Sequence, residues 1–162
     1  MKLYLEGVTV KGIIAAIIAI VSAQVLKVPL NALKTGKWDV KQILGSGGMP
    51  SSHSAGVTSL ATYVGLKLGS RSLDFALSII FGLIVMYDAQ GVRKHAGETA
   101  IKVNELEKRI DQLSGDNQDE AHDKKSKQLK ESIGHQPEEV LGGAILGFIV
   151  GFISFLSHRK SK

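Results

Sequence analysis

Cysteine is absent from this chain of 162 residues, and proline and aromatic residues are scarce. Without cysteine, the protein forms neither disulfides nor thiolate metal sites. The net charge is +5, but aromatic residues make up only 6% of the chain and no known nucleic-acid-binding motif occurs. We therefore do not expect nucleic acid as a partner. The length fits a single domain over residues 1–162.

Charged residues are rare in four long apolar stretches, and lysine and arginine gather in the segments between them. The first stretch, Val8 to Val28, is interrupted only by Lys11, Gln24 and Lys27. It is long enough to cross a membrane, because a helix needs about 20 residues to span a hydrocarbon core of about 30 Å. It is longer than a typical signal-peptide core and lacks a clear small-x-small cleavage site, so we favour a membrane span over a cleaved leader. The other stretches are Ser54 to Gly69, Leu73 to Ala89 and Val140 to Leu156.

Together these stretches predict an all-α fold, a multi-pass membrane bundle of about four apolar helices. The second stretch is short and contains several Ser, Thr and Gly residues, so we expect the other helices to shelter it. Between the third and fourth stretches, Ala100 to Leu113 predict an amphipathic helix on the membrane surface or over the bundle. The polar residues from about 114 to 130 are expected to be mobile.

Three glycines of the last stretch, Gly143, Gly147 and Gly151, recur every four residues. This spacing places them on one helix face, where another helix can approach closely. The neighbour is either a helix of the same chain or a second copy, which would make a homo-oligomer. An intramolecular contact is the simpler expectation.

The segment GGMPSSHSA, residues 47–55, begins the second stretch. Pro50 suits the first helical position, and the serines that follow it can cap the helix. A helix start attracts phosphate, because its N–H groups are unpaired and carry a partial positive charge. Gly47 and Gly48 let the backbone come close to a ligand, and His53 exchanges protons near neutral pH. The alternative interpretation is a capped helix with an incidental histidine.

Polar residues gather at one end of the predicted bundle. If each stretch crosses once, the end of the first, the start of the second, the end of the third and the start of the fourth share one side. Each polar group has an ordinary explanation, such as a lysine that snorkels to the interface or acidic residues that favour a helix start. Their coincidence at four helix ends favours a site. The residues are Gln24 and Lys27; Ser51, Ser52 and His53; Asp88, Arg93, Lys94 and His95; and His135, Glu138 and Glu139.

These residues resemble the divergent, short relatives of the type-2 phosphatidic acid phosphatase and vanadium-dependent haloperoxidase superfamily. The superfamily pattern Pro-Ser-Gly-His corresponds here to Pro50-Ser51-Ser52-His53, with Ser for Gly, and Lys34 stands where the pattern has Arg-Pro after Lys27. His135 and Glu139 keep the spacing of the pattern's last His and acid, with Glu for Asp. The matching segments span most of the chain: AQVLK at 23–27, GGMPSSHSA at 47–55, IVMYDAQGVR at 84–93 and GHQPEEV at 134–140.

The resemblance implies a phosphatase that needs no metal or other cofactor and acts on a lipid or prenyl phosphate through a phosphohistidine. His135 would be the nucleophile, oriented by Glu139 or, in its place, Glu138; His53 would be the general acid. His95 is the rival nucleophile. Asp88 would position Arg93 or Lys27, and the phosphate oxygens would be bound by Lys27, Arg93, Ser52, Ser51 and the backbone at Gly48.

Other interpretations stay open. A Mg²⁺ site of Asp88, Glu98 and Glu138 or Glu139 is conceivable, because hard cations favour oxygen ligands. The same basic, glycine-rich end would also suit a non-catalytic binder or transporter of a phosphate-bearing lipid or anion, and a structural membrane subunit is a weaker alternative. Lysine and arginine are more numerous on the site's side, so the positive-inside tendency favours a cell-membrane protein with a cytoplasmic site.

Overall fold

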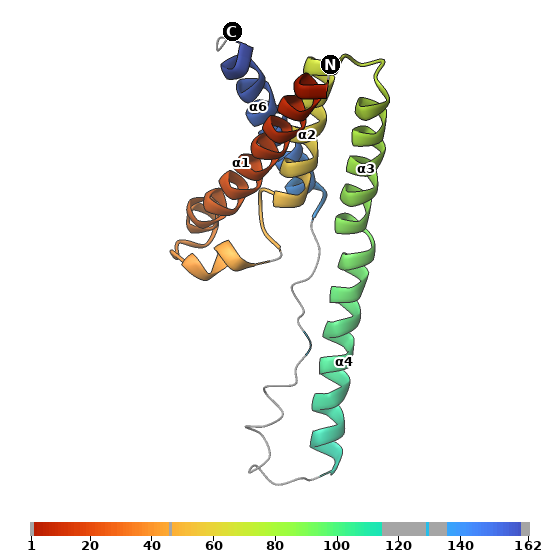
Figure 1. Cartoon of the computed structure of the whole chain (residues 1–162). Coiled ribbons are helices and arrows are strands. Elements are labelled where there is room, and N and C mark those ends of the chain that lie inside the picture. Colours follow the sequence, from red (N-terminus) through yellow and green to blue (C-terminus); the bar gives the residue numbers. More distant parts are fainter. Residues whose placement is uncertain (1, 46, 115–128, 130–135, 160–162) are drawn as a thin grey trace.

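The computed structural model of the chain describes residues 2–45, 47–114, 129 and 136–159. These residues form α-helices and one short 3-10 helix and contain no strand, so the all-α prediction is confirmed. The polar segment that we expect to be mobile lies outside the described residues, apart from Ser114 and Leu129. In chain order the elements are α1 (Lys2–Thr35), η1 (Val40–Leu44), α2 (Ser52–Leu68), α3 (Leu73–Gln90), α4 (Val92–Ser114) and α6 (Pro137–Arg159) (Figure 1).

Three helical segments of the described chain are long and apolar enough to cross a membrane: Val10–Thr35, Leu73–Ile110 and Pro137–His158. The shorter α2 lies at the centre, because α1, α3 and α6 all pack against it. Its buried residues are mostly small, including Ser54, Ala55 and Gly56. The prediction of a short second helix sheltered by the others is therefore confirmed.

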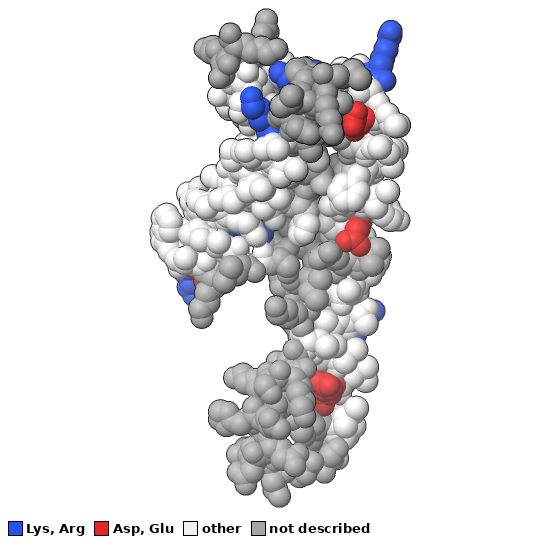
Figure 2. All heavy atoms as spheres, viewed as in Figure 1, with Lys and Arg blue, Asp and Glu red and all other residues white. Residues whose placement is uncertain are grey.

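Large apolar side chains lie on the outside of this bundle and small ones lie inside. Ile17, Phe81 and Phe148 are all more than half exposed, whereas Ala19 and Ala55 are fully buried. Figure 2 shows mostly uncharged residues along the flank of the bundle. Water would penalise such a surface, but a hydrocarbon solvent would not. The protein is therefore a membrane protein.

The glycine face of α6 packs against the backbone of α2. A methyl group on any of these three glycines would collide with a main-chain carbonyl oxygen of α2 or of its N-cap residue, so the two helices interlock at four-residue intervals. The structure thus shows the intramolecular alternative: the glycines serve packing within one chain. The facing pairs are Gly143 with Ser51, Gly147 with Ala55, and Gly151 with Ser59.

The amphipathic helix is present as α4, but it continues α3 instead of lying over the bundle (Figure 1). Helical hydrogen bonding persists across the junction at Gly91. Its N–H donates to the Tyr87 carbonyl at 2.8 Å, and its own carbonyl accepts from the N–H of His95 at 3.1 Å. Gly91 also keeps right-handed helical dihedral angles. With no proline at this point, nothing turns the chain away from the axis of α3.

Candidate phosphate site

A small polar cavity lies at the end of the bundle where the sequence predicts a site. Its volume is about 110 Å³, and it is bordered by α1, η1, the loop before α2 and the first turn of α6. Among the described residues, two lysines and two side-chain amides share its wall with one carboxylate. The lining residues are Lys27, Leu30, Asn31, Lys34, Gln42, Gly48, Met49 and Glu139.

One face of α1 supplies half of this lining. Lys27, Leu30, Asn31 and Lys34 are spaced by three or four residues, which aligns their side chains along one side of a helix. The Lys27 side chain is buried, with 1% of the residue exposed, and its Nζ donates to the Gly45 carbonyl at 3.1 Å. Lys27 therefore does not snorkel to the surface, and that ordinary explanation fails.

The glycine loop before α2 lies directly against these side chains. Gly48 has a φ of +91°, a backbone conformation that glycine adopts without steric cost. A Cβ at this position would lie 3.6 Å from Gln42 Oε1 and 3.8 Å from Lys27 Cδ. The predicted close approach of backbone at Gly48 thus occurs beside the buried lysine.

Ser51 is the N-cap of α2. Its Oγ accepts hydrogen bonds from the backbone N–H of Ser54 at 3.4 Å and from the Ser54 hydroxyl at 3.1 Å. Its own N–H donates to the Glu139 carbonyl oxygen at 2.9 Å, which ties the starts of α2 and α6 together. Pro50 lies before the cap, so its predicted place at the first helical position is wrong; Ser52 occupies that place.

Glu139 has two roles at the start of α6. Its Oε2 accepts from the backbone N–H of Gln136 at 3.2 Å, which is half of a capping box. The same residue lines the cavity that contains Lys27, so opposite charges meet there. Glu138, the substitute orienter, is exposed and does not belong to this lining.

The other predicted site residues lie outside this cavity. His53 is exposed in the first turn of α2, beside the buried Ser52, and Asp88 is half-buried near the end of α3. His95, the rival nucleophile, is exposed on α4, and its Nδ1 lies 3.2 Å from Glu98 Oε2. His135 and the side chain of Arg93 lie outside the described residues.

The carboxylates of the alternative Mg²⁺ site are not gathered in the described part of the chain. No group of three or more His, Asp or Glu side chains there could hold a metal ion. Glu98 instead faces His95 on the exposed surface of α4. The structure therefore gives this alternative no support.

The cavity contains two polar residues that sequence reasoning misses, Asn31 and Gln42. Asn31 has a detectable signal, because it lies four residues after Lys27 on the same helix face. Gln42 has none in its local sequence. It reaches the cavity only because η1 folds back beneath α1, and that turn is set by tertiary packing.

The fold and the cavity define an α-helical membrane protein with a lysine- and amide-lined cavity at one end of the bundle. Sequence comparison matches residues 8–150 to the divergent PAP2 family, so the chain belongs to that family and the predicted resemblance is confirmed. The chain is also similar to the uncharacterized membrane protein YuiD of Bacillus subtilis (strain 168). The two are 41% identical over 152 residues, which cover 92% of this chain and 96% of that protein. No solved structure matches the chain.

Proposed function

We propose that the protein is a membrane phosphatase that hydrolyses a lipid or prenyl phosphate at the cavity end of its bundle. The observation that carries the proposal is the buried Lys27 in a cavity with Lys34 and a single carboxylate, Glu139. A buried charge is costly unless a partner compensates it. Among the described lining residues, the buried Lys27 and the exposed Lys34 outnumber one carboxylate, and a phosphate group would balance this excess of positive charge.

The proposed reaction forms and then breaks a phosphohistidine. His135 attacks the phosphorus atom, the bond from phosphorus to the lipid oxygen breaks, and His53 gives its proton to the departing alcohol. Water then cleaves the phosphohistidine and releases phosphate. Lys27, Arg93 and the N-terminus of α2 stabilise the charge on the phosphoryl oxygens.

The link between α2 and α6 supports this arrangement. The hydrogen bond from Ser51 N–H to the Glu139 carbonyl oxygen holds the helix turn that carries His53 against the start of α6. In the sequence, the proposed nucleophile His135 precedes Glu139 by four residues, and the proposed general acid His53 follows Ser51 by two. Asp88, half-buried near the end of α3, would position Arg93 or Lys27.

An apolar groove supports a lipid as the substrate. It has a volume of about 480 Å³ and lies between α2, α3 and α6, with Val57 and Leu66 of α2 along its length. At 1.5 Å per residue these nine steps span about 14 Å, enough for much of one hydrocarbon chain. Val57 and Ala144 in its wall lie only five residues beyond Ser52 and Glu139, so the groove begins close to the site end of both helices.

The test measures phosphate release by the purified protein from phosphatidic acid, phosphatidylglycerophosphate and prenyl phosphates. We expect turnover of at least one substrate, its persistence after chelation of metals, and inhibition by vanadate.

His135→Ala and His53→Ala should abolish turnover, whereas His158→Ala, at the opposite end of α6, should retain it. Full turnover by His135→Ala with none by His95→Ala would contradict our choice of nucleophile. If the protein binds these lipids but hydrolyses none of them, the phosphatase proposal is wrong and the protein is a non-catalytic binder of lipid phosphates.

A further inference from the structure

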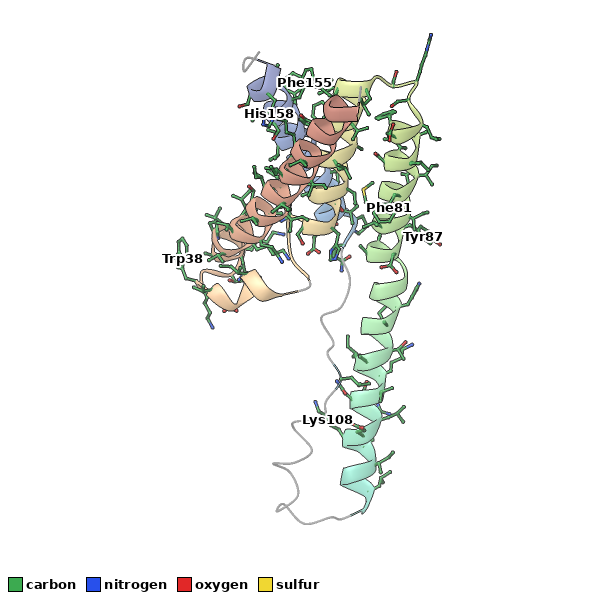
Figure 3. The ribbon with its side chains drawn as sticks, viewed as in Figure 1. Trp38, Phe81, Tyr87, Lys108, Phe155 and His158 are labelled. Atoms are coloured by element: carbon green, nitrogen blue, oxygen red, sulfur yellow. The ribbon has the colours of Figure 1, made fainter. Side chains whose placement is uncertain are left out.

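The turn that follows α1 exposes three large apolar side chains within eight residues. Leu33 is 83% exposed, Trp38 is 75% exposed and Val40 is 66% exposed. We name this segment, residues 33–40, the elbow. Figure 3 shows Trp38 at the outer edge of the molecule, away from the other helices. Because water penalises a cluster of exposed apolar side chains, the elbow has the character of an interaction surface.

The elbow lies at the edge of the bundle. Among the described elements, η1 contacts only α1. The chain reverses at Gly36, which has a φ of +71°, and its N–H donates to the Ala32 carbonyl at 2.8 Å. A Cβ at Gly36 would meet no described atom within 4 Å. The turn therefore projects outward from the end of α1 and is not packed under another helix (Figure 1).

The elbow also lies at the end of a candidate membrane span. The apolar span of α1 ends at Thr35, so Leu33 belongs to its last turn and Trp38 follows it by three residues. Tryptophan is enriched where a membrane meets water, because its ring is apolar and its N–H needs a polar partner. The apolar surface of the elbow is thus continuous with the part of α1 that crosses the membrane.

Basic residues alternate with these apolar residues. Lys34 and Lys37 are both exposed. Together with Asp39 they give residues 33–40 a net charge of +1, and Lys41 follows directly in the sequence. Figure 2 shows basic and acidic atoms side by side at this corner of the molecule. Lysine side chains at the edge of a membrane reach toward the headgroups, and their charge attracts anionic lipids.

We infer that the elbow is a binding surface for anionic phospholipids at the membrane interface. Its apolar side chains enter the boundary between headgroups and lipid chains, and its lysines contact the phosphates in the hydrated layer above. Lipid reaches this surface directly, because the elbow adjoins a membrane span. Lys34 and Gln42 also line the phosphate cavity, so a lipid bound at the elbow would hold that cavity at headgroup level.

The fluorescence of Trp38 tests the position of the elbow, because the chain contains no other tryptophan. The full-length protein is reconstituted into vesicles that contain phosphatidylcholine brominated either close to the headgroup or close to the chain ends. We expect stronger quenching by the bromine close to the headgroup. Quenching by aqueous acrylamide alone would place the elbow in water and overturn the inference. Protection from acrylamide and from both lipids would place protein over the elbow and would overturn it as well.

Preference for anionic lipid is measured by replacing the brominated phosphatidylcholine with brominated phosphatidylglycerol. This lipid is a phosphodiester and offers no phosphate monoester, so its binding is independent of the proposed hydrolysis. We expect phosphatidylglycerol to quench Trp38 more strongly. Lys37→Gln should lower this preference by up to about fivefold, because each lysine near an anionic surface contributes attraction of that order.

Arg71→Gln is the matched control, since Arg71 is exposed in the turn between α2 and α3, at the other end of the bundle. It should keep the full preference for phosphatidylglycerol. Equal quenching of the parent protein by the two lipids would show that the elbow does not select anionic lipid. Equal losses in Lys37→Gln and Arg71→Gln would show that the preference arises from the net charge of the protein. Either result would overturn the inference.

Discussion

The hydrogen-bond partner of Lys27 is a main-chain carbonyl, and this partner bears on whether the ammonium can bind an anion. An ammonium has three N–H donors, of which one bonds the Gly45 carbonyl oxygen. The nearby carboxylate of Glu139 is itself engaged with the N–H of Gln136. Among the described residues, Lys27 Nζ is therefore bound by neutral backbone, with the Glu139 carboxylate in the wall of the same cavity.

Lys27→Met removes the charge but keeps much of the side-chain volume. We expect phosphate release to fall by about 100-fold, as when one donor to a transition-state oxyanion is removed. Stability should change little, because the change deletes one hydrogen bond with a net value of about 1 kcal/mol. Steady-state kinetics on the best substrate, with thermal unfolding in the same detergent, measures both effects.

Lys67→Met is the matched control, since Lys67 lies in the last turn of α2, at the other end of the bundle. It should leave phosphate release within about twofold of the parent, because this half-buried lysine lies far from the site. Equal losses in the two variants would show that Lys27 acts through general stability. Unchanged activity in Lys27→Met would remove Lys27 from the site.

The sequence predicts Lys27, Gly48 and Glu139 as site residues, and the cavity contains all three. Each belongs to a motif with its own physical signal: a lysine in an apolar helix, a glycine pair before a cap, and an acid after proline. Gln42 has no such signal. Its place depends on how η1 packs beneath α1, which no local pattern encodes.

At the scale of elements, the contact between α2 and α6 decides the geometry of the site. The carbonyl oxygens of Ala55 and Ser59 occupy the space that a Cβ atom would need at Gly147 and Gly151. The two helix axes can therefore approach closely. The same contact brings Ser51 within hydrogen-bonding distance of Glu139. A shift between these helices would therefore displace His53 and Glu139 relative to each other.

Gly147→Ala should destabilise the protein by about 1–3 kcal/mol, because the new methyl group would collide with the rigid Ala55 carbonyl. Gly142→Ala is the matched control on the same helix. Its methyl group would meet only the flexible end of Met49, at 2.9 Å, which can move aside. Thermal unfolding of the purified variants measures the difference. A Gly142→Ala protein as unstable as Gly147→Ala would contradict the proposed interlock.

The helices themselves follow from hydropathy, because a lipid solvent leaves few alternatives to a long apolar helix. The position of α4 does not follow in the same way. Amphipathic character predicts that one face seeks an apolar neighbour, but it does not say whether that neighbour is lipid, the bundle or another chain. The unbroken hydrogen bonding at Gly91 settles the direction of α4, and this depends on a single backbone conformation.

For the whole molecule, the four helices of the bundle place both termini at the end opposite the site (Figure 1). The turn between α2 and α3 lies at that same end. The loop after α1 and helix α4 lie on the side of the cavity. Lysine and arginine are more numerous on the cavity side, so we propose that this side faces the cytoplasm and that the protein resides in the cell membrane.

Single cysteines in the two sides test this orientation, since the parent chain has none to interfere. Trp38, 75% exposed after α1 (Figure 3), marks the cavity side, and the exposed Ser70 marks the other. In intact cells, a membrane-impermeant maleimide should label Ser70→Cys but label Trp38→Cys only after the membrane is permeabilised. The reverse pattern would place the cavity outside the cell. The substrate phosphate would then lie in the outer leaflet. The excess of lysine on the cavity side would reflect anion binding and not membrane orientation.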